Sequence, residues 1–176
     1  SREEEVWKAG NDGEQRVANF LASKLSDEWI LISGFMTGKG EIDLILVGPA
    51  GVFAMEVKFV RGVVHCDGDR WWRDKSDNYG NVVERDVPIK DARGRGPSRQ
   101  LNETADVLQN LLNRRFGEGR VRRVVVLAHE QSKLGNIKNS TVDAVVSLSQ
   151  WNTNQIPGAV REVPPNIVQE VASEIA

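Results

Sequence analysis

The residues best suited to chemistry in this sequence are Asp43 and the triplet Glu56-Val57-Lys58, which combine two carboxylates with one ammonium group. Both lie within otherwise apolar stretches of the chain. Carboxylate oxygens are the ligands that Mg²⁺ and Mn²⁺ prefer, and these ions are usually held by one or two carboxylates together with water and substrate phosphate. The residue types therefore predict a divalent-cation site between Asp43 and Glu56.

The segment that must position these residues, 40–59, is predicted to form a β-hairpin. Its two apolar halves flank Gly48-Pro49-Ala50-Gly51, whose Pro and Gly residues suit a tight reversal of the backbone. Pairing of Val47 with Val52 fixes the register, and a slip of one residue would move every side chain to the other face. In that register the charged residues share one face in two opposed pairs, Asp43 with Glu56 and Glu41 with Lys58. The other face is uniformly apolar: Ile42, Leu44, Leu46, Phe53, Met55, Val57 and Phe59.

The cost of this charge cluster supports the metal interpretation. Two opposed carboxylates about 5 Å apart repel by roughly 3 kcal/mol at an effective dielectric constant of about 20. Lys58 offsets part of this repulsion, and a divalent cation would offset the rest. The alternative is an ion-pair cluster on a solvated face, in which Lys58 pairs with Glu41 or Glu56. An Asp directly opposite Glu56 in an otherwise apolar hairpin favours the metal site over the ion-pair cluster.

Composition indicates a single globular domain without a membrane span. The chain has 176 residues, 40% of them hydrophobic, and a net charge of −2, so any surface for nucleic acid must be a local patch. The single cysteine excludes an internal disulfide framework and a cysteine-based zinc site. The sequence contains no apolar run long enough for a membrane span and no signal-peptide pattern. We therefore expect a cytoplasmic protein, and the start at Ser1 suggests excision from a larger one.

Hydrophobic periodicity predicts helices before and after the hairpin. We expect residues 1–10 to be a short lead-in and 11–176 to form one domain, which begins with a helix over 11–25. Glu14 lies on the apolar stripe of that helix and has two interpretations. It can close a capping box with Asn11 at the helix start, or it can point towards the charged end of the hairpin.

The other predicted elements surround the hairpin in sequence. They are a strand over 29–33, a smaller antiparallel extension of the sheet over 60–73, a loop or weak hairpin over 74–91, a helix over 97–116, strands over 124–128 and 142–148 separated by a polar excursion over 129–140, and a final helix over 166–176. Trp71 and Trp72 in the extension can stack on nucleobases, but aromatic residues in strands more often fill a core, which we favour. His65 in the same extension is expected to be structural.

A basic segment precedes the second long helix and is the best local candidate for contacts with phosphate. Its cations are spaced by glycine and proline, which predicts a flexible loop, and a solvated loop without function is the alternative. The candidate nucleic-acid-binding residues are Lys90, Arg93, Arg95 and Arg99.

The order of elements and motifs resembles the nuclease-related domain (NERD) family of the PD-(D/E)XK nuclease superfamily. Four blocks carry the resemblance, namely Gly13-Glu14, Ile42-Asp43, Gly51-Val52-Phe53 with Glu56-Val57-Lys58, and Pro97 with Gln100. The family's Asn before Pro is Gly96 here. The resemblance implies an α/β fold with a restriction-endonuclease-like αβββαβ core, in which helices flank a mixed central sheet.

The resemblance also implies roles for individual residues in metal-dependent hydrolysis of phosphodiester bonds. Asp43, Glu56 and the backbone carbonyl of Val57 would hold Mg²⁺ or Mn²⁺, and Glu14 would orient a water molecule or complete a second metal site. Lys58 would position the attacking water or stabilise charge at the phosphorus centre. Gln100 would help position Lys58 or the water.

The expected substrate is nucleic acid, with DNA favoured over RNA. A homodimer is expected if both strands of a duplex are cut, because that reaction needs two sites. The competing interpretation is a catalytically inactive module on the same fold that binds nucleic acid or a protein partner through its basic segments. Such a module needs no metal.

Overall fold

The computed structural model describes residues 2–117, 119–151 and 165–175, with side chains described for 12–117, 119–151 and 169–175. In these ranges the helices are α1 (Arg2–Lys24), α2 (Pro97–Phe116) and α3 (Pro165–Ile175), with a short 3₁₀ helix at Leu148–Gln150. The strands are β1 (Ile30–Thr37), β2 (Gly40–Gly48), β3 (Gly51–Lys58), β4 (Gly62–Asp67), β5 (Arg70–Ser76), β6 (Val82–Pro88), β7 (Val121–Leu127), β8 (Ser132–Lys138) and β9 (Ala144–Ser147). No helix in the described ranges is long and apolar enough to cross a membrane.

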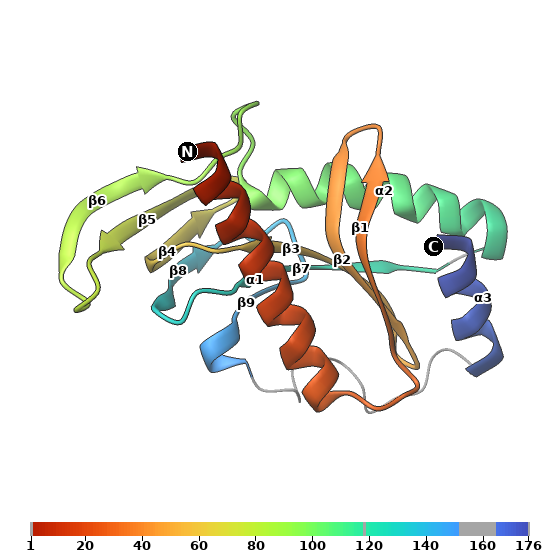
Figure 1. Cartoon of the computed structure of the whole chain (residues 1–176). Helices are drawn as coiled ribbons and strands as arrows, with labels where there is room; N and C mark the ends of the chain where they lie inside the picture. Colours follow the sequence, from red (N-terminus) through yellow and green to blue (C-terminus); the bar gives the residue numbers. More distant parts are fainter. Residues whose placement is uncertain (1, 118, 152–164, 176) are drawn as a thin grey trace.

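A five-stranded mixed sheet forms the centre of the molecule, in the order β1-β2-β3-β7-β9 (Figure 1). The predicted hairpin is β2–β3, and its register is the predicted one, with Val47 opposite Val52 and Ile45 opposite Ala54. β7 joins β3 in parallel, and β9 joins β7 in parallel. The expected αβββαβ order is confirmed by α1, β1, β2, β3, α2 and β7.

Three strands between β3 and α2 belong to a separate four-stranded sheet, in the order β6-β5-β4-β8. The prediction that residues 60–73 extend the central sheet is therefore wrong, although a hairpin turn is present between β4 and β5 at Gly68-Asp69, immediately after Asp67. The polar excursion over 129–140 contains β8, which pairs in parallel with β4. Its polar sequence hid this strand, because β8 lies at a sheet edge and only Ser132 in it is fully buried.

Helices cover both faces of the central sheet, with α1 on one face and α2 on the other (Figure 1). Val17 and Leu21 of α1 pack on a core cluster that includes Leu44, Leu46, Phe53, Met55 and Val57. The buried stripe of α2 packs with Ile45, Val47 and Ala54, and α3 adds Val171 and Ile175 to this second cluster. The residues predicted to form the apolar face of the hairpin pack with the α1 cluster, except for Ile42, which packs with the α2 cluster.

The displacement of Ile42 has a local cause in the backbone of β1 and β2. The pairing of β1 with β2 skips the position of Gly34 opposite Asp43, and Gly34 has a φ of 71°. The strict alternation of side chains is therefore interrupted between Ile42 and Leu44. This interruption coincides with the residue that was expected to bind metal.

The first helix begins much earlier than predicted. α1 runs without a break from Arg2 to Lys24, so Asn11 lies inside the helix and not at its N-cap position. Glu14 is consequently not part of a capping box. It lies in the middle of a long helix that crosses the sheet close to the end of β3, where a Cβ on Gly13 would lie 3.0 Å from Cβ of Phe59.

Candidate active site

Asp43 lies where the pairing of β2 with β3 ends. The last backbone pair is Leu44 with Met55, one step short of the predicted pair of Asp43 with Glu56. Beyond this pair, the Asp43 side chain takes the place of a backbone acceptor, and its Oδ2 accepts the backbone N–H of Val57 at 2.8 Å. The two strands thus separate at this end, and the Asp43 side chain is fixed in the opening.

The backbone of Val57 faces the same opening. In a β-strand the N–H and C=O groups of one residue point to the same edge, and those of the next residue point to the other. Lys58 directs its carbonyl to the β7 side, where it accepts the N–H of Ala128 at 2.9 Å. The carbonyl of Val57 therefore points towards β2 and Asp43.

Glu56 and Lys58 form an ion pair inside the site. Oε1 of Glu56 lies 3.0 Å from Nζ of Lys58, and the Glu56 side chain is only 6% exposed. Nζ of Lys58 also donates to Oε1 of Gln100 at 3.3 Å. The amide of Gln100 in turn donates through Nε2 to the carbonyl of Arg95 at 3.0 Å. Lys58 is therefore held between β3 and the first turn of α2.

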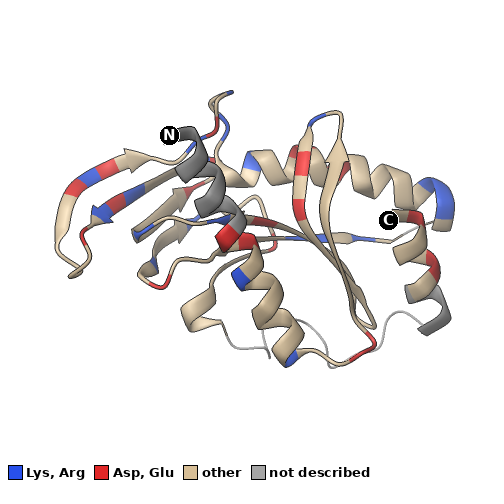
Figure 2. Ribbon diagram, in the orientation of Figure 1, with Lys and Arg blue, Asp and Glu red and all other residues tan. Residues whose placement is uncertain are grey.

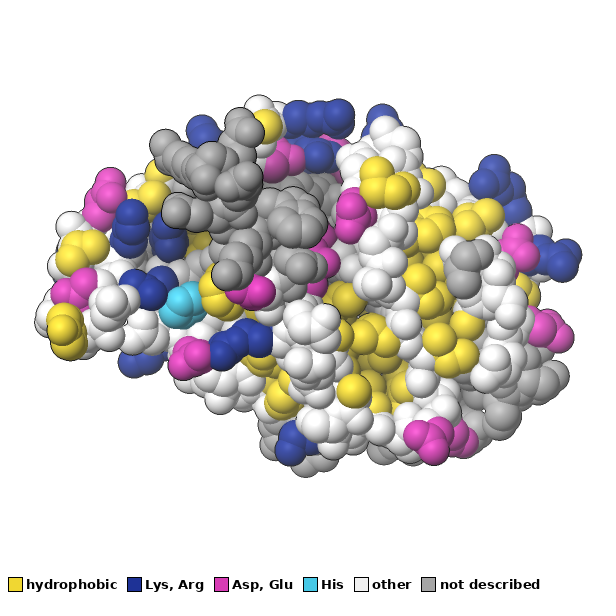
Figure 3. All heavy atoms as spheres, viewed as in Figure 1, with side chains coloured by type: hydrophobic (Ala, Val, Ile, Leu, Met, Phe, Trp, Pro, Cys, Tyr) yellow, Lys and Arg dark blue, Asp and Glu magenta, His cyan; other side chains and the backbone are white. Residues whose placement is uncertain are grey.

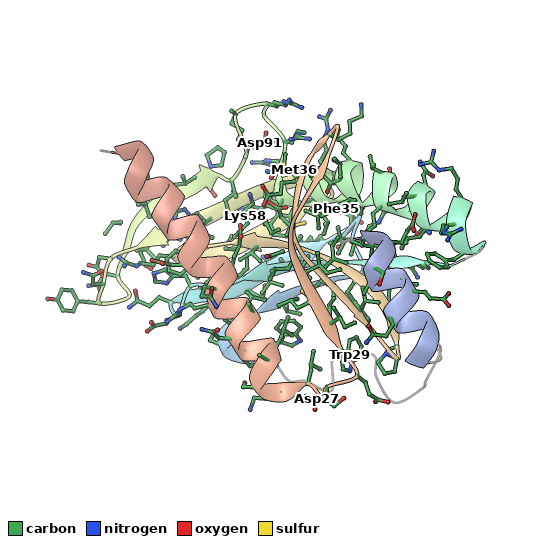
Figure 4. The ribbon with its side chains drawn as sticks, turned by 45° about the vertical axis from the view of Figure 1, so that its right-hand side comes forward. Asp27, Trp29, Phe35, Met36, Lys58 and Asp91 are labelled. Atoms are coloured by element: carbon green, nitrogen blue, oxygen red, sulfur yellow. The ribbon has the colours of Figure 1, made fainter. Side chains whose placement is uncertain are left out.

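Glu14 reaches this end of the sheet from α1. Oxygen atoms from the carboxylates of Glu14, Glu41 and Asp43 lie within 4.8 Å of one another, a spacing suited to a shared cation. Figure 2 shows acidic residues on α1 and on the β1–β2 hairpin, the two elements that supply this cluster. Figure 4 labels Lys58 between α1 and that hairpin, below the loop that carries Asp91.

The observed carboxylate cluster differs from the expected ligand set in one member. Glu41 belongs to it, whereas Glu56 does not. Sequence reasoning assigned Glu41 to the charged face but not to the metal. The signal available in the sequence was the place of Glu41 at the charged end of the predicted hairpin, two residues from Asp43. Glu56 lies deeper in the fold, beside Lys58.

Burial, together with crowding of negative charge, raises the pKa of Glu14, Asp43 and Glu56 in the site. Burial, followed by repulsion from Asp43, raises the pKa of Glu56 to about 8. The same two causes, with repulsion from Glu41, raise the pKa of Glu14 to about 7. Burial also raises the pKa of Asp43, although the hydrogen bond from Val57 and the charge of Lys58 oppose the increase. The site therefore holds more negative charge than its surroundings stabilise without a cation.

The basic segment before α2 is an ordered loop and not a flexible one. Asp91 accepts the backbone N–H groups of Arg93 and Arg95, at 3.0 and 2.8 Å, and fixes the turn. The guanidinium group of Arg95 is bound to Asp91 at 2.8 Å and to Glu103 at 2.6 Å, and the side chain is only 11% exposed. Arg95 therefore stabilises the loop and is not available to phosphate.

The remaining predicted phosphate contacts are accessible. Lys90 and Arg93 are exposed, and no carboxylate in the described ranges forms an ion pair with either. Arg99 is 59% exposed and pairs with Glu103 at 3.1 Å. Lys90 and Arg93 lie in the loop before α2, and Arg99 lies in the first turn of α2.

Gly96 shows why this chain lacks an Asn before Pro97. A Cβ at this position would lie 2.6 Å from the carbonyl oxygen of Asp69 and 3.0 Å from Cδ1 of Trp71. The loop backbone therefore lies directly against the start of β5, where only glycine fits. This close contact joins the second sheet to the N-terminus of α2.

Trp71 and His65 of the second sheet have structural roles. Trp71 is only 3% exposed, as the core interpretation predicted, and donates from Nε1 to Oγ of Ser98 at 2.8 Å. Nδ1 of His65 accepts the N–H of Asn136 at 3.0 Å, so the ring donates from Nε2 to Asp74 at 3.2 Å. Both ring nitrogens of His65 are occupied within the fold.

Comparison with known proteins gave no match among curated proteins and no match among solved structures. The chain does match the family model of the nuclease-related domain over residues 9–128, which is more than half of its length. The matched range contains the carboxylate cluster, Lys58 and Gln100, and a place in the PD-(D/E)XK superfamily is consistent with it. The chain therefore belongs to the nuclease-related domain family.

Proposed function

We propose that this protein is a metal-dependent nuclease that hydrolyses phosphodiester bonds of nucleic acid, with DNA as the expected substrate. The observation that supports this proposal is the convergence of Glu14, Glu41 and Asp43 beside the Glu56–Lys58 ion pair at the open end of the β2–β3 hairpin. These groups come from two distant elements, α1 and the hairpin, and the fold brings them to one place.

The donor set fits Mg²⁺ or Mn²⁺. Carboxylates of Asp43, Glu14 and Glu41, together with the Val57 carbonyl, offer only hard oxygen ligands, and no nitrogen or sulfur donor belongs to the cluster among the described residues. Burial and repulsion from Asp43 raise the pKa of Glu14 to about 7 and of Glu56 to about 8, which means that their ionised forms lack compensation unless a cation binds. When bound, a divalent cation lowers the pKa of water and neutralises charge on the phosphate.

The side chains of the protein would then stabilise charge on the phosphate and align the attacking water. The ammonium group of Lys58, held by Glu56 and Gln100, would stabilise negative charge that develops on the phosphate oxygens. Glu14 would accept a hydrogen bond from the attacking water and align it with phosphorus. Val57 would hold Asp43 in place through its backbone N–H.

The test is cleavage by Asp43→Asn, measured with Mg²⁺ and Mn²⁺ on plasmid, linear duplex, single-stranded DNA and RNA. Asparagine keeps an oxygen that can accept the Val57 N–H but removes the negative charge, so the fold should survive. We expect cleavage to fall by at least about 100-fold. The matched control is Asp106→Asn, which removes a carboxylate that is paired with Arg123 and 64% exposed. Undiminished cleavage by a pure preparation of Asp43→Asn would overturn the proposal.

A catalytically inactive binding module is the outcome to be distinguished. Such a module would bind nucleic acid without any link between metal and stability. We therefore expect Mn²⁺ to raise the melting temperature of the unaltered chain and to raise that of Asp43→Asn much less, because this variant removes a charged ligand from the carboxylate cluster. Equal shifts in the two proteins would argue against a metal site that involves Asp43.

A further inference from the structure

A pocket outside the carboxylate cluster lies between the second sheet and the loop that leads into α2. It has a volume of about 400 Å³ and is lined mainly by Arg70, Trp72, Asp86, Pro88, Lys90 and Gly96. Lys and Arg side chains gather over β5 and β6, the strands that border it (left side of Figure 3). A volume of this size is within the range of small-ligand sites and holds about one nucleotide, not a duplex.

The wall of the pocket combines a planar cation with an aromatic ring. The guanidinium carbon of Arg70 lies 4.7 Å from the ring centroid of Trp72. Trp72 is itself stacked on His65, with ring centroids 5.6 Å apart, and His65 is fixed by its two hydrogen bonds. Nucleobases stack both on aromatic rings and on guanidinium planes. Trp72 is thus already in contact with both His65 and Arg70, and the exposed guanidinium plane of Arg70, which Trp72 supports, is the preformed surface for one base.

Charge at the mouth of the pocket suits a phosphate group. Arg70 and Lys90 are both exposed, and neither forms an ion pair with a carboxylate in the described part of the chain. Their positive charges are thus available to the backbone of the same nucleotide whose base enters the pocket. Asp86 and Asp69 also border the space and offer acceptors for amino groups on a base edge.

The pocket is joined to the candidate active site by one short segment of chain. Gly94 and Gly96 line the pocket, while Arg95 between them turns its side chain to Asp91 and Glu103. The carbonyl of Arg95 accepts a hydrogen bond from Gln100, which contacts Lys58. Lys58 and the pocket are therefore linked within the fold through Gln100 and the loop residues 94–96.

We propose that this pocket binds one unpaired nucleotide of the substrate strand, next to the phosphodiester bond that the carboxylate cluster cleaves. The proposal rests on the proposed nuclease function and adds a substrate class, namely nucleic acid that is single-stranded at this position. A base within a duplex has both faces stacked and cannot occupy the Arg70–Trp72 surface.

The test is binding of a fluorescein-labelled single-stranded DNA ten-mer to the full chain in EDTA, measured by fluorescence anisotropy. EDTA prevents cleavage, so binding is read without catalysis. We expect Arg70→Ala and Lys90→Ala each to weaken binding by at least about fivefold, the lower end of the effect of losing one stacked base. Arg70→Lys should recover little of the loss, because it keeps the charge without the planar group. Arg114→Ala, an exposed cation at the far end of α2, should bind as the unaltered chain does.

A blunt-ended DNA duplex of about ten base pairs, which has no unpaired loop, separates this pocket from general attraction to phosphate. We expect Arg70→Ala to change its affinity by less than about twofold. Equal losses for the duplex and the single strand, or no loss for either, would overturn the pocket assignment. That result would leave metal-dependent cleavage, and its dependence on Asp43, untouched. Conversely, loss of single-strand binding in Arg70→Ala alongside unaltered cleavage by Asp43→Asn would support the pocket and refute the nuclease site.

Discussion

Lys58 is bound on one side by Glu56, with Nζ 3.0 Å from Oε1, and its side chain is still 24% exposed. The ammonium group is therefore held in place but accessible to a substrate. We predict that Lys58→Met lowers the rate of cleavage by about 100-fold, because a positioned charge that stabilises the transition state is lost. Metal binding should persist, since Lys58 is not a ligand. Isothermal titration with Mn²⁺, run beside the cleavage assay, checks both parts.

The pKa values of the site predict that the metal-free protein loses stability as pH rises. Burial and repulsion from Asp43 raise the pKa of Glu14 to about 7 and of Glu56 to about 8, from 4.5 for each group in an unfolded chain. The folded state therefore binds more protons than the unfolded state between these values. The stability that these two groups contribute to the folded state is fully present below about pH 4.5, and it is lost as pH rises through about 7 and 8. Denaturant melts in EDTA from about pH 5 to pH 9 measure this decrease.

Two additions to the same experiment identify the groups responsible. Glu14→Gln should flatten the pH dependence, because the protonated acid and the amide carry the same charge. Mn²⁺ should raise the melting temperature more at about pH 8 than at about pH 5.5, since protons compete with the cation for the carboxylates. A metal-free protein that is most stable at pH 8 would contradict the raised pKa values of Glu14 and Glu56.

Gln100 is predicted to be a positioning residue. Its side chain bridges Nζ of Lys58 and the carbonyl of Arg95, so Gln100→Ala should leave Lys58 less well oriented. We expect kcat to fall by about tenfold with little change in KM, the pattern of an interaction that matters in the transition state. Gln100→Glu keeps an acceptor for Lys58 but loses the donor to Arg95, and should recover part of the activity.

Gly96 is predicted to be intolerant of any side chain. Because a Cβ there would overlap the carbonyl of Asp69, Gly96→Ala should destabilise the fold by about 1–3 kcal/mol. Gly38→Ala is the matched control, since nothing lies within 4 Å of its added methyl group. Urea denaturation of the two variants compares them directly. Similar midpoints would show that the loop can move away from β5 at little cost.

Two neighbouring arginines in the basic loop should behave in opposite ways. Arg95→Ala leaves Asp91 and Glu103 without their shared partner and should lower the melting temperature. Arg93→Ala should leave stability within about 0.5 kcal/mol, because the side chain is exposed. It should instead reduce the salt dependence of nucleic-acid binding. Thermal melts and salt titrations distinguish the two residues.

Much of the central sheet was predictable because its signals are local. The hairpin register follows from one turn and from the alternation of side chains, and pairing of Val47 with Val52 placed Asp43 and Glu56 at one end. The buried stripes of α1 and α2 and the strand β7 were likewise visible as periodic apolar residues. The second sheet was not, because β8 is polar and β6 is almost fully exposed.

The sequence by itself determined which chemistry this protein carries, since the carboxylates, Lys58 and the four motif blocks are readable without coordinates. Only the tertiary structure decided how these groups are combined. Packing of α1 across the sheet, and not a helix cap, places Glu14 beside Glu41 and Asp43, and the cluster contains Glu41 in place of the expected Glu56. The contact of Gly96 with β5 likewise joins the second sheet to the N-terminus of α2. These choices depend on contacts between distant segments, which no local pattern of residues records.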